Sequence, residues 1–221
     1  YFQLETTEIA PMTVTAEQPA SQSQERQRAL DFAAARRAMI DSQLRTSGVN
    51  QRFVLERMGA VAREEFVPAS ARGTAYMDRA IRLENGGFLP APVFHGMMLE
   101  EAAPRADDVV VVVDGGSGYL AELVRPLVAS LETLDADTAA KGDVTQSGAT
   151  LLLIDGAIEH LPAGLAGMLA DGGRVVTGLV ERGVTRLATG RKVAGSLGLL
   201  PLAETGIPRL GQFDKPVGWT F

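Results

Sequence analysis

A short glycine-containing turn carries the residues best suited to chemistry. It spans Asp114–Gly118 and directly follows the valine run Val109–Val113. Glycine lacks a Cβ, so backbone N–H groups in such a turn can approach a bound nucleotide closely. The candidate cofactor-binding residues of the turn are Asp114, Gly116, Ser117 and Gly118. A tight strand-to-helix turn without a ligand is the alternative interpretation, because a short glycine motif alone is weak support for binding.

A second candidate ligand is an acidic side chain behind the next predicted strand. That strand is Leu131–Leu134, and Asp135 follows it. An acid at this place takes the ribose hydroxyls in dinucleotide-binding folds, so we assign that role to Asp135. The alternative is a solvated loop acid. Asp155 follows the predicted strand Leu151–Ile154 and could act at the same edge of the sheet, although Asp-Gly pairs are also common in turns.

The elements that must position these residues are predicted by their hydrophobic patterns. Runs such as Val109–Val113 and Leu151–Ile154 are typical of strands buried on both faces of a parallel sheet. Strands that alternate with helices predict an α/β fold with a doubly wound, mostly parallel sheet, and closely spaced late strands predict an antiparallel edge. Helices are expected over Tyr119–Val128 and Leu161–Leu169, and further strands over Arg174–Leu179, Val184–Ala188 and Leu197–Leu202.

The N-terminal part is predicted to be helical. Residues 1–24 are interpreted as a tag remnant, Tyr1–Gln3, and a flexible tail, followed by a single domain over residues 25–221. Within that domain we expect a helical part over residues 25–100 and a sheet core over residues 105–221. The individual predictions are a helix from about Gln24 to Ser47 that ends at Gly48, a second helix capped by Asn50, a short helix over Ala69–Met77, a loop over Ile81–Pro92 and a helix over Val93–Ala103.

Composition and charge exclude several classes of function. A net charge of −6 with a pI near 5.0 and no basic patch makes nucleic acid an unexpected partner. The chain has no cysteine, which excludes disulfides, thiolate metal sites and thiol catalysis. The two histidines, His95 and His160, are far apart in sequence, so we expect neither a metal site nor a His-based triad. With no apolar run of membrane-spanning length and no signal-peptide pattern, we expect a cytoplasmic protein that does not enter a membrane.

Several short motifs, taken in order, resemble the protein-L-isoaspartate O-methyltransferase family. Arg63–Pro68 resembles its Arg-Glu-x-Phe-Val-Pro element, and Ala75–Asp78 resembles its Ala-Tyr-x-Asp element. Gly116–Tyr119 resembles the end of its cofactor loop, and Asp171–Val176 resembles a Pro-Gly-Gly-Arg-hydrophobic strand entry. The resemblance implies a Rossmann-like methyltransferase fold, S-adenosylmethionine as cofactor, and methyl transfer to a carboxylate of a damaged aspartyl residue, with a protein or peptide as partner.

Two of the family's functional loops are altered here. The cofactor loop of the family reads acidic-x-Gly-x-Gly-Ser-Gly-Tyr. Aligned on Tyr119, the acidic position is Val112 and the first glycine is Asp114; alternatively the loop is two residues shorter and Asp114 is itself the acid. The family's substrate loop reads Gly-x-Thr-x-Ser-x-Pro, and Phe88 and Pro90 stand where the two hydroxyl residues should be. Proline offers neither a hydroxyl nor an N–H, so the catalytic residues stay unassigned.

The segment after Asp135 is shorter than the resemblance implies. The family places a helix and a further strand, which borders the adenine, before the strand at Leu151. Residues 136–149 are too few for both, so we expect a fold shortened by about one β-α unit. The sheet edge that this leaves exposed would invite pairing with a second chain, and a homodimer is our hypothesis.

Two functions follow from these observations. One is an S-adenosylmethionine-dependent protein carboxyl methyltransferase of the isoaspartyl type, with degraded substrate and cofactor motifs. The other is a catalytically inactive relative that binds or regulates. A nicotinamide-dependent enzyme is disfavoured, because no full Gly-x-Gly-x-x-Gly follows the Val109–Val113 strand.

Overall fold

The computed structural model describes residues 19–142 and 148–215. The chain divides into two compact units, residues 1–34 and 35–221, and each is described by itself. Helix α1 (Pro19–Met39) begins in the first unit, earlier than the start near Gln24 that the sequence predicted. The predicted flexible tail is therefore helical from Pro19 on, whereas the predicted tag remnant lies outside the described residues.

The predicted end of the first helical stretch at Gly48 is confirmed. Helix α1 continues into a π-helical turn (Ile40–Leu44) and a 3₁₀ turn (Arg45–Ser47). Gly48 follows with a φ of 88° and donates its N–H to the Arg45 carbonyl at 3.2 Å. This left-handed conformation favours glycine and terminates the helix.

Helix α2 (Arg52–Ala60) is present as predicted, but its cap is a different residue. The Asn50 side chain donates to the Gly48 carbonyl and does not cap the helix. A Glu100 carboxylate oxygen accepts the backbone N–H groups of Asn50 and Gln51 instead. A charged acceptor from a distant element thus satisfies the amides at this helix end.

The segment between α2 and the sheet is more ordered than a loop. It contains two 3₁₀ helices, Arg63–Phe66 and Ala69–Thr74, the second of which is shorter than the predicted helix over Ala69–Met77. Two-residue strands β1 (Ile81–Arg82) and β2 (Phe88–Leu89) form an antiparallel hairpin where the sequence predicted only a loop. Helix α3 (Pro92–Ala102) follows with Pro92 in its first turn, where the missing N–H is tolerated.

A six-stranded sheet organises the second unit, with strand order β4-β3-β5-β6-β7-β8. The first four strands are parallel and the last two are antiparallel, which confirms the predicted fold class. The strands are β3 (Val109–Asp114), β4 (Ser130–Asp135), β5 (Ala149–Ile158), β6 (Leu169–Glu181), β7 (Val184–Val193) and β8 (Ser196–Glu204).

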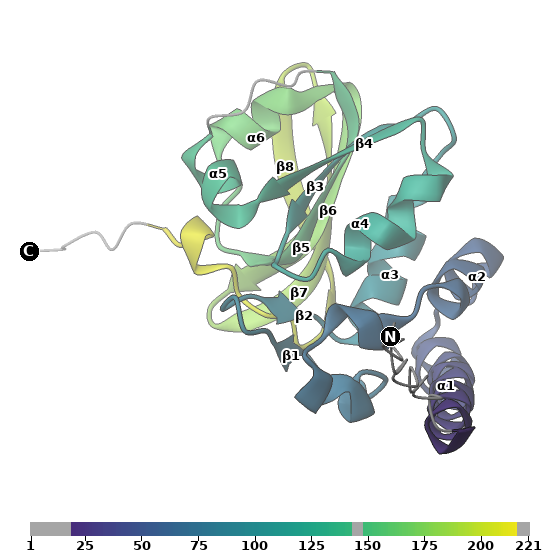
Figure 1. Cartoon of the computed structure of the whole chain (residues 1–221). Coiled ribbons are helices and arrows are strands. Elements are labelled where there is room, and N and C mark those ends of the chain that lie inside the picture. Colours follow the sequence, from purple (N-terminus) through teal and green to yellow (C-terminus); the bar gives the residue numbers. More distant parts are fainter. Residues whose placement is uncertain (1–18, 143–147, 216–221) are drawn as a thin grey trace, which may run out of the picture. The chain divides into compact units, whose positions relative to one another are not determined.

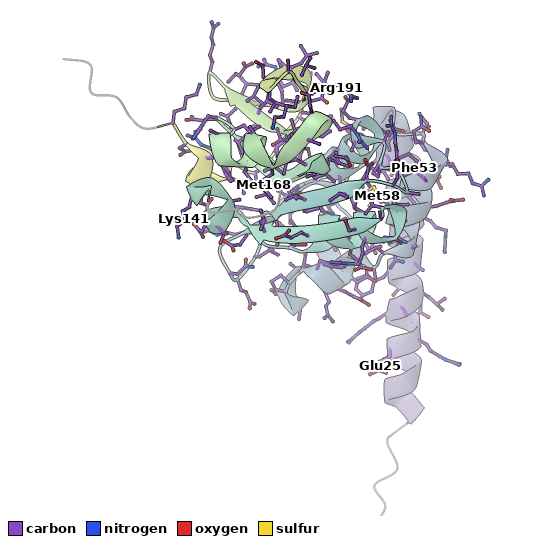
Figure 2. The ribbon with its side chains drawn as sticks, turned by 90° about the horizontal axis from the view of Figure 1, so that it is seen from above. Glu25, Phe53, Met58, Lys141, Met168 and Arg191 are labelled. Atoms are coloured by element: carbon purple, nitrogen blue, oxygen red, sulfur yellow. The ribbon has the colours of Figure 1, made fainter. Side chains whose placement is uncertain are left out.

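Helices cover both faces of this sheet (Figure 1). Helices α5 (Ala136–Lys141) and α6 (Ala163–Met168) pack on one face, over a core that includes Val111, Val113, Leu152 and Ile154. Helices α3 and α4 (Tyr119–Val124) lie on the other face. Figure 2 shows Lys141 and Met168 on one side of this unit and Phe53 and Met58 of α2 on the other. Val110, Val111, Val112 and Val113 are all buried, because an uninterrupted apolar run suits a strand that is covered on both faces.

Among the described residues the sheet has no strand beyond β4, as predicted. Helix α5 follows β4 directly, and β5, the next strand along the chain, pairs on the far side of β3. Within residues 19–142 and 148–215, β4 pairs only with β3, so it is the edge of the sheet. The fold is therefore shortened by about one β-α unit at this edge.

Candidate functional site

A cleft of about 680 Å³ opens at the carboxyl ends of β3 and β4. In open parallel sheets this edge is where ligands bind, because the loops that follow the strands meet there. Four segments line the cleft: the β1–β2 hairpin turn, the glycine turn after β3, the start of α5, and a late segment that leads into a 3₁₀ helix (Gly211–Phe213). The lining residues are 85–88, 114–116, 135–137 and 209–212.

The structure brings together three of the five predicted cofactor-binding residues. Asp114, Gly116 and Asp135 all line the cleft, and Asp114 and Asp135 are direct partners across the β3–β4 ladder. Ser117 and Gly118 lie in the same turn but not among the residues that line the cleft. The parallel register thus places two carboxylates side by side at the mouth of the site.

The position of Asp114 bears on the two alignments of the glycine turn. Val112 is fully buried in the core and cannot reach a ligand. Asp114 is the last residue of β3, and its Oδ1 accepts the Gly118 N–H at 2.8 Å. Burial raises the pKa of the Asp114 carboxyl, against the hydrogen bond from Gly118, and the charge of Asp155 adds to the increase. Of the two positions, Asp114 lines the cleft and Val112 does not.

Close backbone packing explains the glycines of this turn. A Cβ at Gly87 would lie 2.3 Å from the Gly115 carbonyl oxygen, and a Cβ at Gly116 would lie 3.0 Å from the Gly87 Cα. The Phe88 N–H donates to the Gly115 carbonyl at 3.0 Å, and the Asn85 amide donates to the Gly116 carbonyl at 2.8 Å. The hairpin turn is thus fastened to the glycine turn and forms one wall of the cleft.

Asp135 caps α5 as well as lining the cleft. Its carboxylate accepts the Thr138 N–H at 2.8 Å and the Thr138 hydroxyl at 2.7 Å, and these two hydrogen bonds lower its pKa. This capping role was not predicted, although an Asp followed by a helical segment is a standard N-cap signal. A carboxylate has about four acceptor positions, so two bonds to Thr138 leave capacity for a ligand hydroxyl.

The late segment of the chain was not predicted to contribute to the site. It is attached to β5 by a hydrogen bond of 2.9 Å from the Leu210 N–H to the Ala157 carbonyl. Arg209 pairs with Glu159 and Asp214, each at 2.7 Å. Sequence alone offered no signal for this contact, because it joins residues about fifty positions apart. Three carboxylates, of Asp114, Asp135 and Asp137, outnumber the one guanidinium of Arg209 along the cleft wall.

The two positions that should carry hydroxyl groups have other roles here. Phe88 lines the cleft and also a neighbouring cavity of about 500 Å³, whose walls include Arg79, Thr185 and Thr205. The Arg82 guanidinium lies 5.9 Å from the centre of the Phe88 ring. Pro90 is buried and accepts a hydrogen bond through its carbonyl from the Arg63 side chain. Neither residue presents a hydroxyl to an acceptor.

A buried polar cluster lies behind the cleft. Asp155, which the sequence placed at a strand end, is a fully buried residue of β5, and its Oδ1 lies 2.8 Å from His95 Nε2 on α3. Arg63 is also fully buried, and its Nη1 lies 3.3 Å from the other ring nitrogen of His95, Nδ1. His160 is part of no such cluster; its Nδ1 lies 2.9 Å from the Phe213 carbonyl. The sequence analysis did not foresee the contact between His95 and Asp155.

In residues 19–142 and 148–215, no group of three or more His, Asp or Glu side chains is arranged to hold a metal ion. None of the helices in this part of the chain has both the length and the apolar character needed to cross a bilayer.

Residues 34–134 match a family model described as Protein-L-isoaspartate(D-aspartate) O-methyltransferase (PCMT). The match runs from α1 to β4 and stops before α5, where the β-α unit is missing. A protein-L-isoaspartate O-methyltransferase of Koribacter versatilis is 32% identical over 190 residues, which cover 75% of this chain and 86% of that protein. One of Methanoculleus marisnigri is 28% identical over 209 residues, covering 83% and 93%.

Solved structures share the fold at low sequence identity. A putative protein-L-isoaspartate O-methyltransferase of Plasmodium falciparum, in complex with S-adenosyl-L-homocysteine, superposes with a TM-score of 0.66 at 16% identity, covering 82% of this chain and 98% of that one. Another protein-L-isoaspartate O-methyltransferase superposes with a TM-score of 0.64 at 16% identity, covering 80% and 66%. At this identity the likeness concerns the fold.

Proposed function

Because the chain belongs to the protein-L-isoaspartate O-methyltransferase family, we propose that it binds S-adenosylmethionine in the cleft at the carboxyl ends of β3 and β4 and transfers a methyl group to a carboxylate of a protein or peptide. One observation carries this proposal. Three residues that the sequence predicted as cofactor ligands come from two strand ends and line a single cleft: Asp114, Gly116 and Asp135. Their convergence on one cleft that is large enough for a nucleoside supports a binding role.

The residues that line the cleft fit the chemistry of this cofactor. A cleft of about 680 Å³ is large enough for a ligand of nucleoside size. S-adenosylmethionine carries positive charge on its sulfonium and ammonium groups, and the excess of carboxylates from Asp114, Asp135 and Asp137 favours a cation. Asp135 and Asp137 can also accept hydrogen bonds from ribose hydroxyls.

The contribution of the protein to methyl transfer is mainly positioning. When bound, S-adenosylmethionine supplies an electrophilic methyl group, which the attacking carboxylate oxygen takes while the C–S electron pair stays on sulfur. A carboxylate is already nucleophilic at neutral pH, so no residue needs to act as general base. Gly87 and Phe88 of the hairpin and the carboxylates of Asp114 and Asp135, which all line the cleft, would hold the two reactants.

The acceptor is expected to differ from that of the family. Phe88 and Pro90 offer no hydroxyl to an isoaspartyl carboxylate, and the Pro90 carbonyl is already bonded to Arg63. A site that has lost a hydrogen-bond donor discriminates less in favour of its former ligand. We therefore propose weak activity on isoaspartyl peptides and a preference for another carboxylate.

A binding or regulatory protein without transferase activity is the second candidate. It is favoured by the Asp114 carboxylate, which already accepts the N–H of Gly118 in its own turn, and by the absent β-α unit after β4, which removes a wall of the cleft. In this reading the cleft still binds a nucleoside-like ligand, and Phe88 blocks access of an acceptor.

Calorimetric titration with S-adenosylmethionine and S-adenosylhomocysteine tests the proposal. Dissociation constants in the micromolar range, or about −8 kcal/mol, support it, and no heat at millimolar ligand overturns it. Asp135→Asn removes the charge but keeps a good N-cap, so we expect about tenfold weaker binding with a nearly unchanged melting temperature. Thr138→Ala is the matched control, since it removes a bond to Asp135 outside the cleft and should leave binding unchanged.

A methyl-transfer assay then separates the two candidates. Incorporation of label from S-adenosylmethionine into any protein or peptide carboxylate supports a transferase. Binding without transfer to isoaspartyl peptides or to other carboxylates supports the non-catalytic relative.

We also infer that the free edge of β4 supports a homodimer. Its outer N–H and C=O groups are available for pairing with a second strand, within the described part of the chain. Light scattering at high protein concentration tests this, and a monomeric mass would count against it.

A further inference from the structure

A chain of buried polar side chains connects β5 to the hairpin. Asp155, His95 and Arg63 are each buried, with His95 and Arg63 fully so. Asp155 Oδ1 lies 2.8 Å from His95 Nε2, and Arg63 Nη1 lies 3.3 Å from His95 Nδ1. At its other end Arg63 donates through Nη2 to the carbonyl of Pro90, directly after β2. Three side chains from three elements thus form one continuous path.

The chemistry of the donors assigns the histidine tautomer. A guanidinium nitrogen can only donate, so His95 Nδ1 must accept from Arg63. The ring proton is then on Nε2, and it is donated to Asp155. His95 is neutral in this arrangement and separates the positive charge of Arg63 from the negative charge of Asp155.

The same guanidinium also contacts the helix that follows the cofactor turn. Its central carbon lies 5.0 Å from the centre of the Tyr119 ring, and the His95 and Tyr119 ring centres are 5.2 Å apart. Tyr119 is the first residue of α4, directly after Gly118. Arg63 therefore contacts the residue directly after β2, through the Pro90 carbonyl, and the helix directly after the glycine turn, through the Tyr119 ring.

Packing alone does not account for such a cluster. Burial lowers the pKa of the Arg63 guanidinium, and the charge of Asp155 opposes that decrease. Buried ion pairs are often no more stable than apolar residues of the same volume, so their contribution is to fix an arrangement. Here the arrangement that they fix is the distance between the hairpin and the turn.

We propose that Arg63, oriented by His95 and Asp155, is a positioning residue that holds the acceptor-side hairpin (residues 85–92) against the cofactor turn. The acceptor role of the hairpin rests on the proposed function; its attachment to the turn does not. The Asp155 backbone takes part as well, because a Cβ at Gly115 would lie 2.4 Å from the Asp155 carbonyl oxygen. A shift of Asp155 would therefore move both the turn and, through His95 and Arg63, the hairpin.

Two substitutions of His95 separate its two hydrogen bonds. In His95→Asn the amide oxygen takes the place of Nδ1 and still accepts from Arg63, while the bond to Asp155 is lost. In His95→Gln the amide nitrogen reaches the place of Nε2 and still donates to Asp155, while the bond to Arg63 is lost. Both variants remove the ring, so they are matched for lost aromatic packing against Tyr119.

The measurement is hydrogen exchange of residues 86–92, followed by mass spectrometry, with no cofactor present. We expect residues 86–92 to exchange about tenfold faster in His95→Gln than in His95→Asn, because only the Gln variant loses the hydrogen bond from Arg63. Equal rates in the two variants would overturn the proposal, since packing alone predicts the same loss in both. Thermal melting shows whether both variants fold.

Asp155→Asn is the second test and covers the case in which a His95 variant does not fold. Asparagine still accepts the His95 proton but removes the charge that balances Arg63, so exchange in residues 86–92 should rise while the rest of the sheet stays protected. Unchanged exchange there would overturn the proposal.

Steady-state kinetics add a readout for the acceptor role: His95→Gln should raise the acceptor KM about tenfold with an unchanged S-adenosylhomocysteine Kd. Wild-type protein that binds no cofactor would instead contradict the proposed function and leave the exchange result standing.

Discussion

The two ends of strand β3 carry the same residue type in opposite circumstances. At the amino end Asp108 accepts two guanidinium hydrogen bonds from Arg174, at 2.7 and 3.0 Å, a bond from the Thr150 hydroxyl at 2.6 Å and one from the Arg105 N–H at 2.7 Å. At the carboxyl end Asp114 faces a cleft and has no cationic partner within the described residues.

The pKa values of the two carboxyls move in opposite directions as a result. Burial raises the pKa of Asp108, but the hydrogen bonds from Arg174, Thr150 and Arg105 outweigh it and bring the value to about 2. Burial also raises the pKa of Asp114, and the bonds from its own turn do not offset that increase. The Asp108 carboxylate has charged and polar hydrogen-bond partners and stabilises the fold. The Asp114 carboxylate lacks enough such partners and lies beside a cleft, and carboxyls with perturbed pKa values in clefts are candidates for functional sites.

The largest effect on stability should come from removing Arg174, the partner of Asp108 at the amino end of β3. Arg174→Ala leaves Asp108 buried without its partner and frees the carbonyls of Ala102 and Ala103, so we expect a loss of about 3 kcal/mol in the free energy of unfolding. Urea denaturation measures it. The affinity for S-adenosylhomocysteine should not change, and a parallel loss of binding would show that the two ends of β3 are not independent.

A smaller loss of stability is expected from adding a side chain to the glycine turn at the carboxyl end of β3. Gly115→Ala places a Cβ 2.4 Å from the Asp155 carbonyl oxygen, so backbone must shift, and we expect about 2 kcal/mol of destabilisation. Gly167→Ala in α6 is the matched control, because nothing lies within 4 Å of its added Cβ. Equal unfolding free energies for the two alanine variants would contradict the close approach.

Acid should remove the stabilising contribution of the Asp108 carboxylate and relieve the destabilising contribution of the partly buried Asp114 carboxylate. The folded pKa of Asp108 is about 2 against an ordinary value of 3.8, so its stabilisation is present above pH 3.8 and is lost as the pH falls toward 2. The shift corresponds to about 2 kcal/mol. The pKa of Asp114 is raised, so protonation of this group favours the folded state. Unfolding curves of wild type and Asp108→Asn between pH 6 and 2 should therefore converge on acidification, whereas a constant difference would contradict the pairing.

The smallest effect on stability should accompany a clear effect on binding. Asp114→Asn keeps an oxygen that can accept the Gly118 N–H, so we expect the unfolding free energy to stay within about 1 kcal/mol of wild type. Removing a negative charge from the cleft should weaken S-adenosylmethionine binding about tenfold, or about 1.4 kcal/mol, as calorimetry can measure. An unchanged Kd would show that Asp114 serves its own turn alone.

The sheet could be predicted from the sequence because each of its main strands has a recognisable local pattern of apolar residues. The valines of β3 need no partner to be recognised as a doubly buried strand, and the short link after Asp135 excludes an added strand by chain length alone. The β1–β2 hairpin was missed because each strand has only two residues, too few for any alternation to appear.

The site could be predicted only as far as its local motifs reach. Asp114, Gly116 and Asp135 each follow a strand, so topology alone brings them to one edge. Arg209 and the His95–Asp155 pair depend on contacts between residues that are fifty or more positions apart, which no local pattern contains. The hydrogen bonds from the Asn50 and Gln51 N–H groups to Glu100 were unpredictable for the same reason.

The open margin of the sheet at β4 has a consequence for how this fold can be enlarged. A strand at a margin has neighbours on one side only, so a segment inserted between α5 and β5 could extend the sheet without disturbing the pairing of β3 with β4 or β5. Loss of a β-α unit at this edge is tolerated equally well, because no interior strand loses a pairing partner. The protein is thus a natural recipient for a grafted β-α module, and the gain in cofactor affinity after such a graft would measure what the absent wall contributes.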